Sequence, residues 1–218
     1  MRRIPACAAA LIVALTACTA SSKTPEPNEE GMVSFGCALA ANSQGWEDDL
    51  TPDSDEPTIP APYGVAALFG AQTATPMAGF ENFEEGARDL ARAASALDVE
   101  TTNDVLADLV ELCDEEGISY DNLNTDEDAV AEFSCSLANT AVNNDAPIDE
   151  WLRPAQEDNM ELNAATSAGT LLSTIELRDS EAYSHFYDDA IGVVEAMSRL
   201  NSEMMETHLA AIDSTCQE

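Results

Sequence analysis

An internal repeat constrains the fold of this chain more than any other feature of its sequence. The pattern Phe-x-Cys-x-Leu-Ala at residues 35–40 recurs at residues 133–138, an offset of 98. A longer apolar pattern starts at Phe80, recurs from Tyr183 at an offset of 103, and ends on a cysteine in both copies. Its members are Phe80, Phe83, Ala87, Leu90, Ala94, Leu97 and Cys113, matched by Tyr183, Phe186, Ala190, Val193, Met197, Leu200 and Cys216. One insertion between the blocks explains the difference in offset, so the sequence predicts two similar units of roughly 100 residues.

The spacing inside both copies indicates α-helices. The apolar residues of the longer pattern follow steps of three and four, which place side chains on one face of a helix, whereas strands alternate by two. The shorter pattern adds one helix around Cys37 and another around Cys135. Their apolar residues are Val33, Phe35 and Leu39, and Val130, Phe133 and Leu137.

Prolines, caps and a glycine delimit the remaining helices. Pro62 and Pro154 suit a first helical turn, where the missing N–H costs little. Thr102 and Ser202 are the expected N-caps of the last helix in each copy, and Gly117 is the expected end of the first of these. The predicted fold class is therefore all-α, with two tandem bundles of about four helices each, each closed by a disulfide.

The N-terminus has the layout of an export signal. Two arginines precede the uncharged run from Ile4 to Ala17, which is too short to span a bilayer permanently. The sequence Leu15-Thr16-Ala17-Cys18 resembles the lipobox of bacterial prolipoproteins. The resemblance covers only the first 18 residues. It implies cleavage before Cys18, a diacylglyceryl group on its thiol and usually a fatty acid such as palmitate on its amino group, which together make a stable membrane anchor.

This resemblance also implies an address. In a single-membrane bacterium, a lipid-anchored protein lies on the extracytoplasmic face of the cell membrane. In a two-membrane cell, position 19 holds Thr and not the Asp that commonly signals retention at the inner membrane, which leaves the outer membrane open as a site. An ordinary secretory signal with a chance cysteine is the alternative interpretation.

The predicted domains follow from these features. Residues 1–17 are the signal peptide, and residues 18–31 are the lipidated cysteine and a flexible tether that has no large apolar residue after Cys18. Residues 32–118 form the first helical unit and residues 119–218 the second.

Four cysteines follow Cys18, namely Cys37, Cys113, Cys135 and Cys216. An even number in an exported chain indicates two disulfides, for which three pairings exist. The repeat favours Cys37 with Cys113 and Cys135 with Cys216, since each pair would join the first and last helices of one unit. The alternative pairing, Cys37 with Cys135 and Cys113 with Cys216, would join the two units.

The charge of the exported chain restricts its partners. Removing Arg2 and Arg3 lowers the eight Lys and Arg to six, against 42 Asp and Glu, so the formal charge is −36. Nucleic acids and anionic lipid headgroups bind basic surfaces, so neither is an expected direct partner. The charge favours a cation or a basic envelope protein, or else serves only solubility.

The sequence offers few candidates for metal or contact sites. His185 and His208 lack the spacing of a di-iron bundle. Met204, Met205 and His208 share one helix and are weak candidate copper ligands, although a partly buried histidine beside core methionines is the simpler interpretation. Trp46 and Trp151 each lie in a polar connection, either packed on their own bundle or exposed to a partner.

No pattern of catalytic residues emerges, and no catalytic residue or cofactor is assigned. Residues 121–132 lack the glycine and ligand positions of a calcium-binding EF-hand, and residues 165–169 only approximate a serine-hydrolase elbow in helical sequence. The sequence therefore predicts a non-enzymatic cell-envelope lipoprotein that acts as a surface-anchored binding or scaffold protein. The alternative is a small-ligand or cation carrier with a pocket between helices or between the two units.

Overall fold

The computed structural model describes residues 24–43, 61–70, 81–143, 148, 160–176 and 183–217, and within these ranges it contains eight α-helices and no strand. This confirms the all-α fold class. The first set of helices is α1 (Glu29–Asn42), α2 (Ala61–Gly70), α3 (Glu81–Ser95) and α4 (Val99–Glu115). The second set is α5 (Glu127–Val142), α7 (Met160–Glu176), α9 (Tyr187–Arg199), preceded by the 3₁₀ turn η3 (Ser184–Phe186), and α10 (Ser202–Cys216). No helix in the described ranges is both long and apolar enough to cross a membrane.

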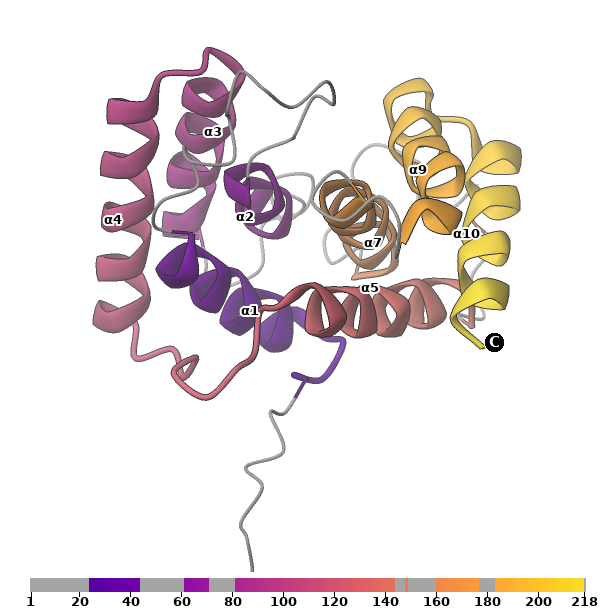
Figure 1. Ribbon diagram of the computed structural model, residues 1–218, viewed down its shortest axis with the longest axis horizontal. Coiled ribbons are helices and arrows are strands. Elements are labelled where there is room, and N and C mark those ends of the chain that lie inside the picture. The colour runs from indigo at the N-terminus through magenta and orange to yellow at the C-terminus, as the bar shows by residue number, and fades with distance from the viewer. Residues whose placement is uncertain are drawn as a thin grey trace, which may run out of the picture.

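The four helices of each set contact one another in the same pattern. In the first set α1 and α3 both contact α2 and α4, and in the second set α5 and α9 both contact α7 and α10. The central helices α2 and α7 pack against each other and join the two sets (Figure 1). Helices α4 and α10 therefore lie at opposite ends of the molecule (Figure 1).

Two disulfides join the first and last helix of each set. Cys37 in α1 is bonded to Cys113 in α4, and Cys135 in α5 is bonded to Cys216 in α10. This is the pairing that the repeat predicts, and the rival pairing between the units is not formed. Cys37 and Cys113 are fully buried, whereas Cys135 and Cys216 are partly buried at the edge of the core.

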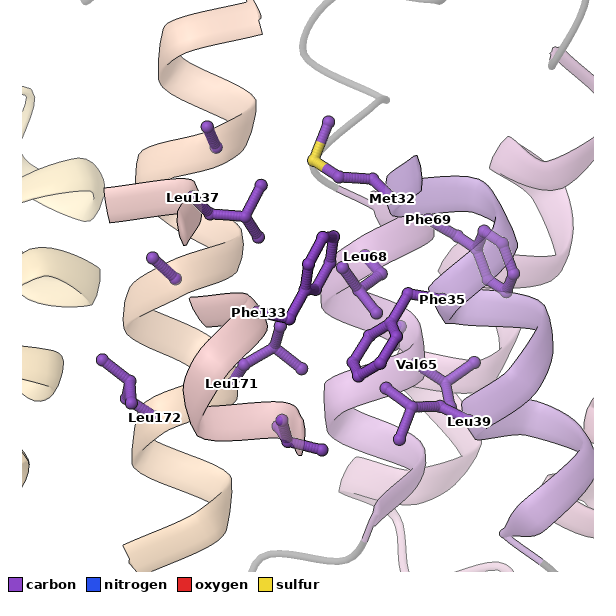
Figure 2. Packing of buried hydrophobic residues seen from close by; sticks show 14 of the residues in the cluster. Met32, Phe35, Leu39, Val65, Leu68, Phe69, Phe133, Leu137, Leu171 and Leu172 are labelled. Carbon is purple, nitrogen blue, oxygen red and sulfur yellow. The ribbon is translucent and has the colours of Figure 1, made fainter. Parts of the chain in front are cut away.

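A single hydrophobic core runs through both sets. Its centre contains Phe35 from α1 and Phe133 from α5, whose ring centroids are 4.5 Å apart (Figure 2). These two residues occupy equivalent positions in the repeat, so equivalent surfaces of the two sets face each other, as in a symmetric dimer. The described core is therefore continuous across the boundary that the sequence places at residue 118.

The start of the fold differs from the prediction. Helix α1 begins at Glu29, and the side chain of Asn28 caps it by accepting a hydrogen bond from the Gly31 N–H at 2.9 Å. Residues 28–31 thus belong to the fold and not to the tether. An asparagine before two glutamates is a favourable helix start, because the acidic side chains complement the positive end of the helix dipole.

The predicted N-caps Thr102 and Ser202 are wrong. Asp98 caps α4, accepting from the Thr101 N–H at 3.1 Å, and Asn201 caps α10, accepting from the Met204 N–H at 3.1 Å. Thr102 is instead fully buried within α4. Several residues that can cap a helix lie near the start of each of these two helices, and the actual cap is the one that directly follows the turn from the preceding helix.

Leu97 and Leu200 also differ from the prediction, which placed them at the end of the buried stripe. Both are exposed and adopt left-handed backbone conformations, with φ of 53° and 51°. The N–H of the following residue, Asp98 or Asn201, bonds back to the carbonyl of Ala93 or Ala196 at 3.0 and 2.9 Å. Each leucine therefore occupies the position of a helix-ending Schellman motif at which glycine is usual. Gly117 ends α4 in the same conformation, as predicted.

Replacing Leu97 or Leu200 with glycine is expected to stabilise the fold. The left-handed conformation costs a leucine about 1–2 kcal/mol, and exposed side chains recover little of this cost by burial. The greater freedom of glycine in the unfolded chain offsets part of the gain, so we expect an increase of about 0.5–1 kcal/mol per site. Urea unfolding followed by circular dichroism measures it, and Leu97→Ala, which keeps the backbone cost, serves as the control.

Candidate functional site

Three of the predicted site residues lie outside the described ranges. Cys18 precedes them, and Trp46 and Trp151 fall in the gaps between α1 and α2 and between α5 and α7. Pro154 falls in the latter gap as well, whereas Pro62 lies in the first turn of α2 as predicted. Lipidation at Cys18 and partner contact at the tryptophans therefore stay predictions.

Among the candidate metal ligands, His208 has the contacts that the structure defines best. Its Nδ1 lies 2.8 Å from Oδ1 of Asp189 in α9, and the two side chains are 24% and 30% exposed. The imidazole packs directly against Gly192. A Cβ added at this glycine would lie 2.4 Å from the nearest ring atoms. The glycine lets the histidine ring pack directly on the α9 backbone, so this contact joins α9 to α10.

The two methionines near His208 lie in or against the hydrophobic core. Met205 is fully buried in the core, and Met204 is partly buried against it. His185 lies in η3 with its ring 4.3 Å from that of Phe186. Across the described part of the chain, no three histidine, cysteine or acidic side chains gather closely enough to hold a metal ion. The geometry of His208 is that of a partly buried histidine beside core methionines.

Gly192→Ala is expected to destabilise the fold by about 1–3 kcal/mol, because the new methyl group would overlap the His208 ring. The first copy of the repeat supplies the control, since Asp89 and Val105 occupy the positions that match Gly192 and His208. Combining Gly192→Ala with His208→Val should therefore recover most of the loss. Denaturant unfolding of the two single variants and the double variant measures this coupling, and simple additivity would contradict the packing described here.

The acidic segment from Asp121 to Glu132 is used to start a helix. Asp126 caps α5, and the hydrogen bonds from the Ala129 N–H and then from the Asn124 amide hold its pKa below the usual value. The segment is helical from Glu127 onward. An EF-hand loop would have to wrap around an ion over these same residues. This segment is therefore a helix start.

Residues 165–169, which only approximate a hydrolase elbow, lie inside α7. Ser167 is fully buried within that helix. A nucleophile elbow instead presents its serine on a sharp turn between a strand and a helix. The local structure therefore agrees with the helical interpretation of this segment.

A surface hollow of about 250 Å³ lies at the start of α1. Its lining consists of Pro25, Glu26, Asn28, Glu30, Gly31 and Ser34. The backbone carbonyl of Glu26 accepts from the Asn28 N–H at 2.8 Å, and the Asn28 side chain caps the helix. Several polar groups of this hollow thus already stabilise the helix start, and the hollow lies neither between helices nor between the two sets.

Sequence reasoning missed two features that the structure shows clearly. Asp189 is the partner of His208, but it lies on another helix and no sequence spacing connects them. Leu97 and Leu200 are exposed at equivalent positions, although their regular spacing predicted burial. The aspartate or asparagine directly after each leucine was the available signal, because such a residue starts a new helix and forces a turn just before it.

Comparisons with protein-family models, with curated proteins and with solved structures find no match to this chain. Its function must therefore be argued from its own residues.

Proposed function

We propose that this chain is a cell-envelope lipoprotein that is anchored through Cys18 and works as a non-enzymatic binding or scaffold protein. The sequence Leu15-Thr16-Ala17-Cys18 is the observation that carries the proposal. The two disulfides support it, because such bonds persist in oxidising compartments outside the cytoplasm. The anchor would hold the protein on the extracytoplasmic face of its membrane.

The body that the anchor holds is, in this proposal, two tandem copies of one four-helix unit. Three pairs of equivalent features support the duplication. The disulfides join equivalent helices, Leu97 and Leu200 form equivalent turns, and Phe35 meets Phe133 at the centre. A duplicated body can present the same surface feature twice, as at Leu97 and Leu200, which suits a protein that binds a partner at two points.

The way the described polar residues are used supports the proposed binding role. Asp98 and Asp126 cap helices, and His208 packs on α9. These side chains serve the helices, and they do not converge on one point as catalysis requires. With a formal charge of −36 after cleavage, the surface suits a partner with a basic surface.

The test is the intact mass of the protein extracted from its own membranes. The expected mass is that of residues 18–218 with acyl groups added and four hydrogens removed by the two disulfides. Cys18→Ser should carry no acyl mass. Cys7→Ser is the matched control and should give the wild-type mass, because residue 7 is removed with the signal. An unacylated wild-type chain would refute the anchor.

A further inference from the structure

Leu97 and Leu200 are the two most exposed of the four large apolar side chains that are exposed in the described part of the chain. Their exposed fractions are 62% and 57%, against 38% and 37% for Tyr187 and Val194. They follow α3 and α9 at equivalent positions of the repeat. Single exposed leucines are ordinary on a protein surface. These two differ because they occupy matched positions of the repeat and both adopt left-handed backbone conformations.

The folded chain alone does not explain these leucines. Their left-handed backbone conformation disfavours any branched side chain, and glycine or asparagine would fit each turn better. Burial could offset that cost, but most of each side chain remains in water. Residues held in unfavourable conformations with exposed side chains are frequent at binding sites, where a partner supplies the missing contacts.

The turns that contain the two leucines share one side of the molecule. The turns from α3 to α4 and from α9 to α10 both lie at the upper edge in Figure 1, one at each end of the body. The first described residues, which lead into α1, lie at the lower edge (Figure 1). The described chain therefore begins on the side opposite these two turns (Figure 1).

The charges beside the leucines indicate the chemistry of the partner. Asp98 and Glu100 follow Leu97, and Glu203 follows Leu200, all of them exposed. The nearby arginines are already paired, Arg92 with Asp89 and Arg199 with Glu195. Exposed acidic side chains that are not paired with these arginines therefore lie close in sequence to both leucines. This disfavours an anionic membrane and a second copy of the same acidic chain as the occupant.

We infer that Leu97 and Leu200 are the two anchor points of a docking surface for an envelope protein whose apolar pockets are bordered by lysine or arginine. Each leucine inserts into one pocket, and the acidic residues beside it pair with the basic border. Binding at two points on one rigid body raises the affinity without a large contact area. This inference rests on the proposed binding function and specifies its surface.

The first step of the test places a photo-cross-linking amino acid at position 97 or 200 of the full-length lipoprotein in its own cells. Ala107 and Ala210 are matched control positions, since they are exposed, lie on α4 and α10, and are equivalent in the repeat. We expect one and the same protein to be captured from 97 and from 200, and not from 107 or 210. The captured protein is then purified for binding measurements.

The second step measures the affinity of that purified protein for the wild type and for variants. Leu97→Gly and Leu200→Gly should each weaken binding about tenfold, and the affinity should fall as salt is added. Both variants should unfold at higher denaturant concentration than the wild type, so unfolding cannot account for the loss. Ala107→Ser and Ala210→Ser should leave the affinity unchanged.

Several outcomes would overturn the inference. Capture from 97 and 200 of lipid, of a second copy of the chain, or of nothing beyond the controls would do so, as would equal affinity for Leu97→Gly and the wild type. Capture of a partner from 107 and 210 alone would remove this docking surface but leave the binding function intact. An unacylated native chain, by contrast, would refute the lipoprotein proposal itself.

Discussion

Replacing Cys37 and Cys113 together with alanine is expected to lower the free energy of unfolding by about 4 kcal/mol in the chain-entropy account of disulfides. The two cysteines are 76 residues apart, so their bond closes a long loop and lowers the conformational entropy of the unfolded chain. Both are also fully buried, so their loss leaves a small cavity beside α1 and α4. A loss of this size is a large share of the stability of a typical small domain.

The second disulfide is the matched control for the first. Cys135 and Cys216 are 81 residues apart, so the entropic loss from Cys135→Ala with Cys216→Ala should be nearly the same. These two cysteines are less buried than Cys37 and Cys113, and this variant should therefore be the less destabilised of the two. Urea unfolding by circular dichroism gives both values. Losses below about 1 kcal/mol for both variants would contradict the entropic account, since removing a native disulfide typically costs more.

The helices and disulfides could be predicted because their signals are local or repeated. Steps of three and four residues identify α3 and α9 directly. The repeat then pairs Cys37 with Cys113, because it assigns both to one unit. The same reasoning failed at Leu97 and Leu200, where the apolar spacing continues but the backbone has already left the helix. Side-chain spacing alone carries no information on the residue at which the last helical hydrogen bond forms.

The relations between helices could not be predicted from the sequence. The stacking of His208 on Gly192 depends on how closely α9 approaches α10, and that distance is set by side chains along both helices. The meeting of Phe35 with Phe133 depends on how the two sets are joined through α2 and α7. A repeat in the sequence establishes that two parts are alike, but it does not establish which of their surfaces meet.

Phe133→Ala is expected to cost about 3–5 kcal/mol, the range for truncating a buried phenylalanine. Phe133 is fully buried, and its ring meets that of Phe35 at the junction of the two sets (Figure 2). Neighbouring side chains are held by α1, α2 and α7, so the cavity cannot close by the movement of one helix. Phe35→Ala should cost a similar amount for the same reason.

The double variant distinguishes a shared core from two separate ones. Because each single substitution already removes the ring contact, Phe35→Ala with Phe133→Ala should cost clearly less than the sum of the two single losses. Leu209→Ala is the control, because Leu209 is buried in α10 and that helix lies away from α1 (Figure 1). It should combine additively with Phe35→Ala to within about 0.5 kcal/mol. Chemical denaturation monitored at several wavelengths should show a single transition for the wild type, since one core links both sets. Additive losses for the phenylalanine pair together with two separate wild-type transitions would mean that the two sets unfold independently.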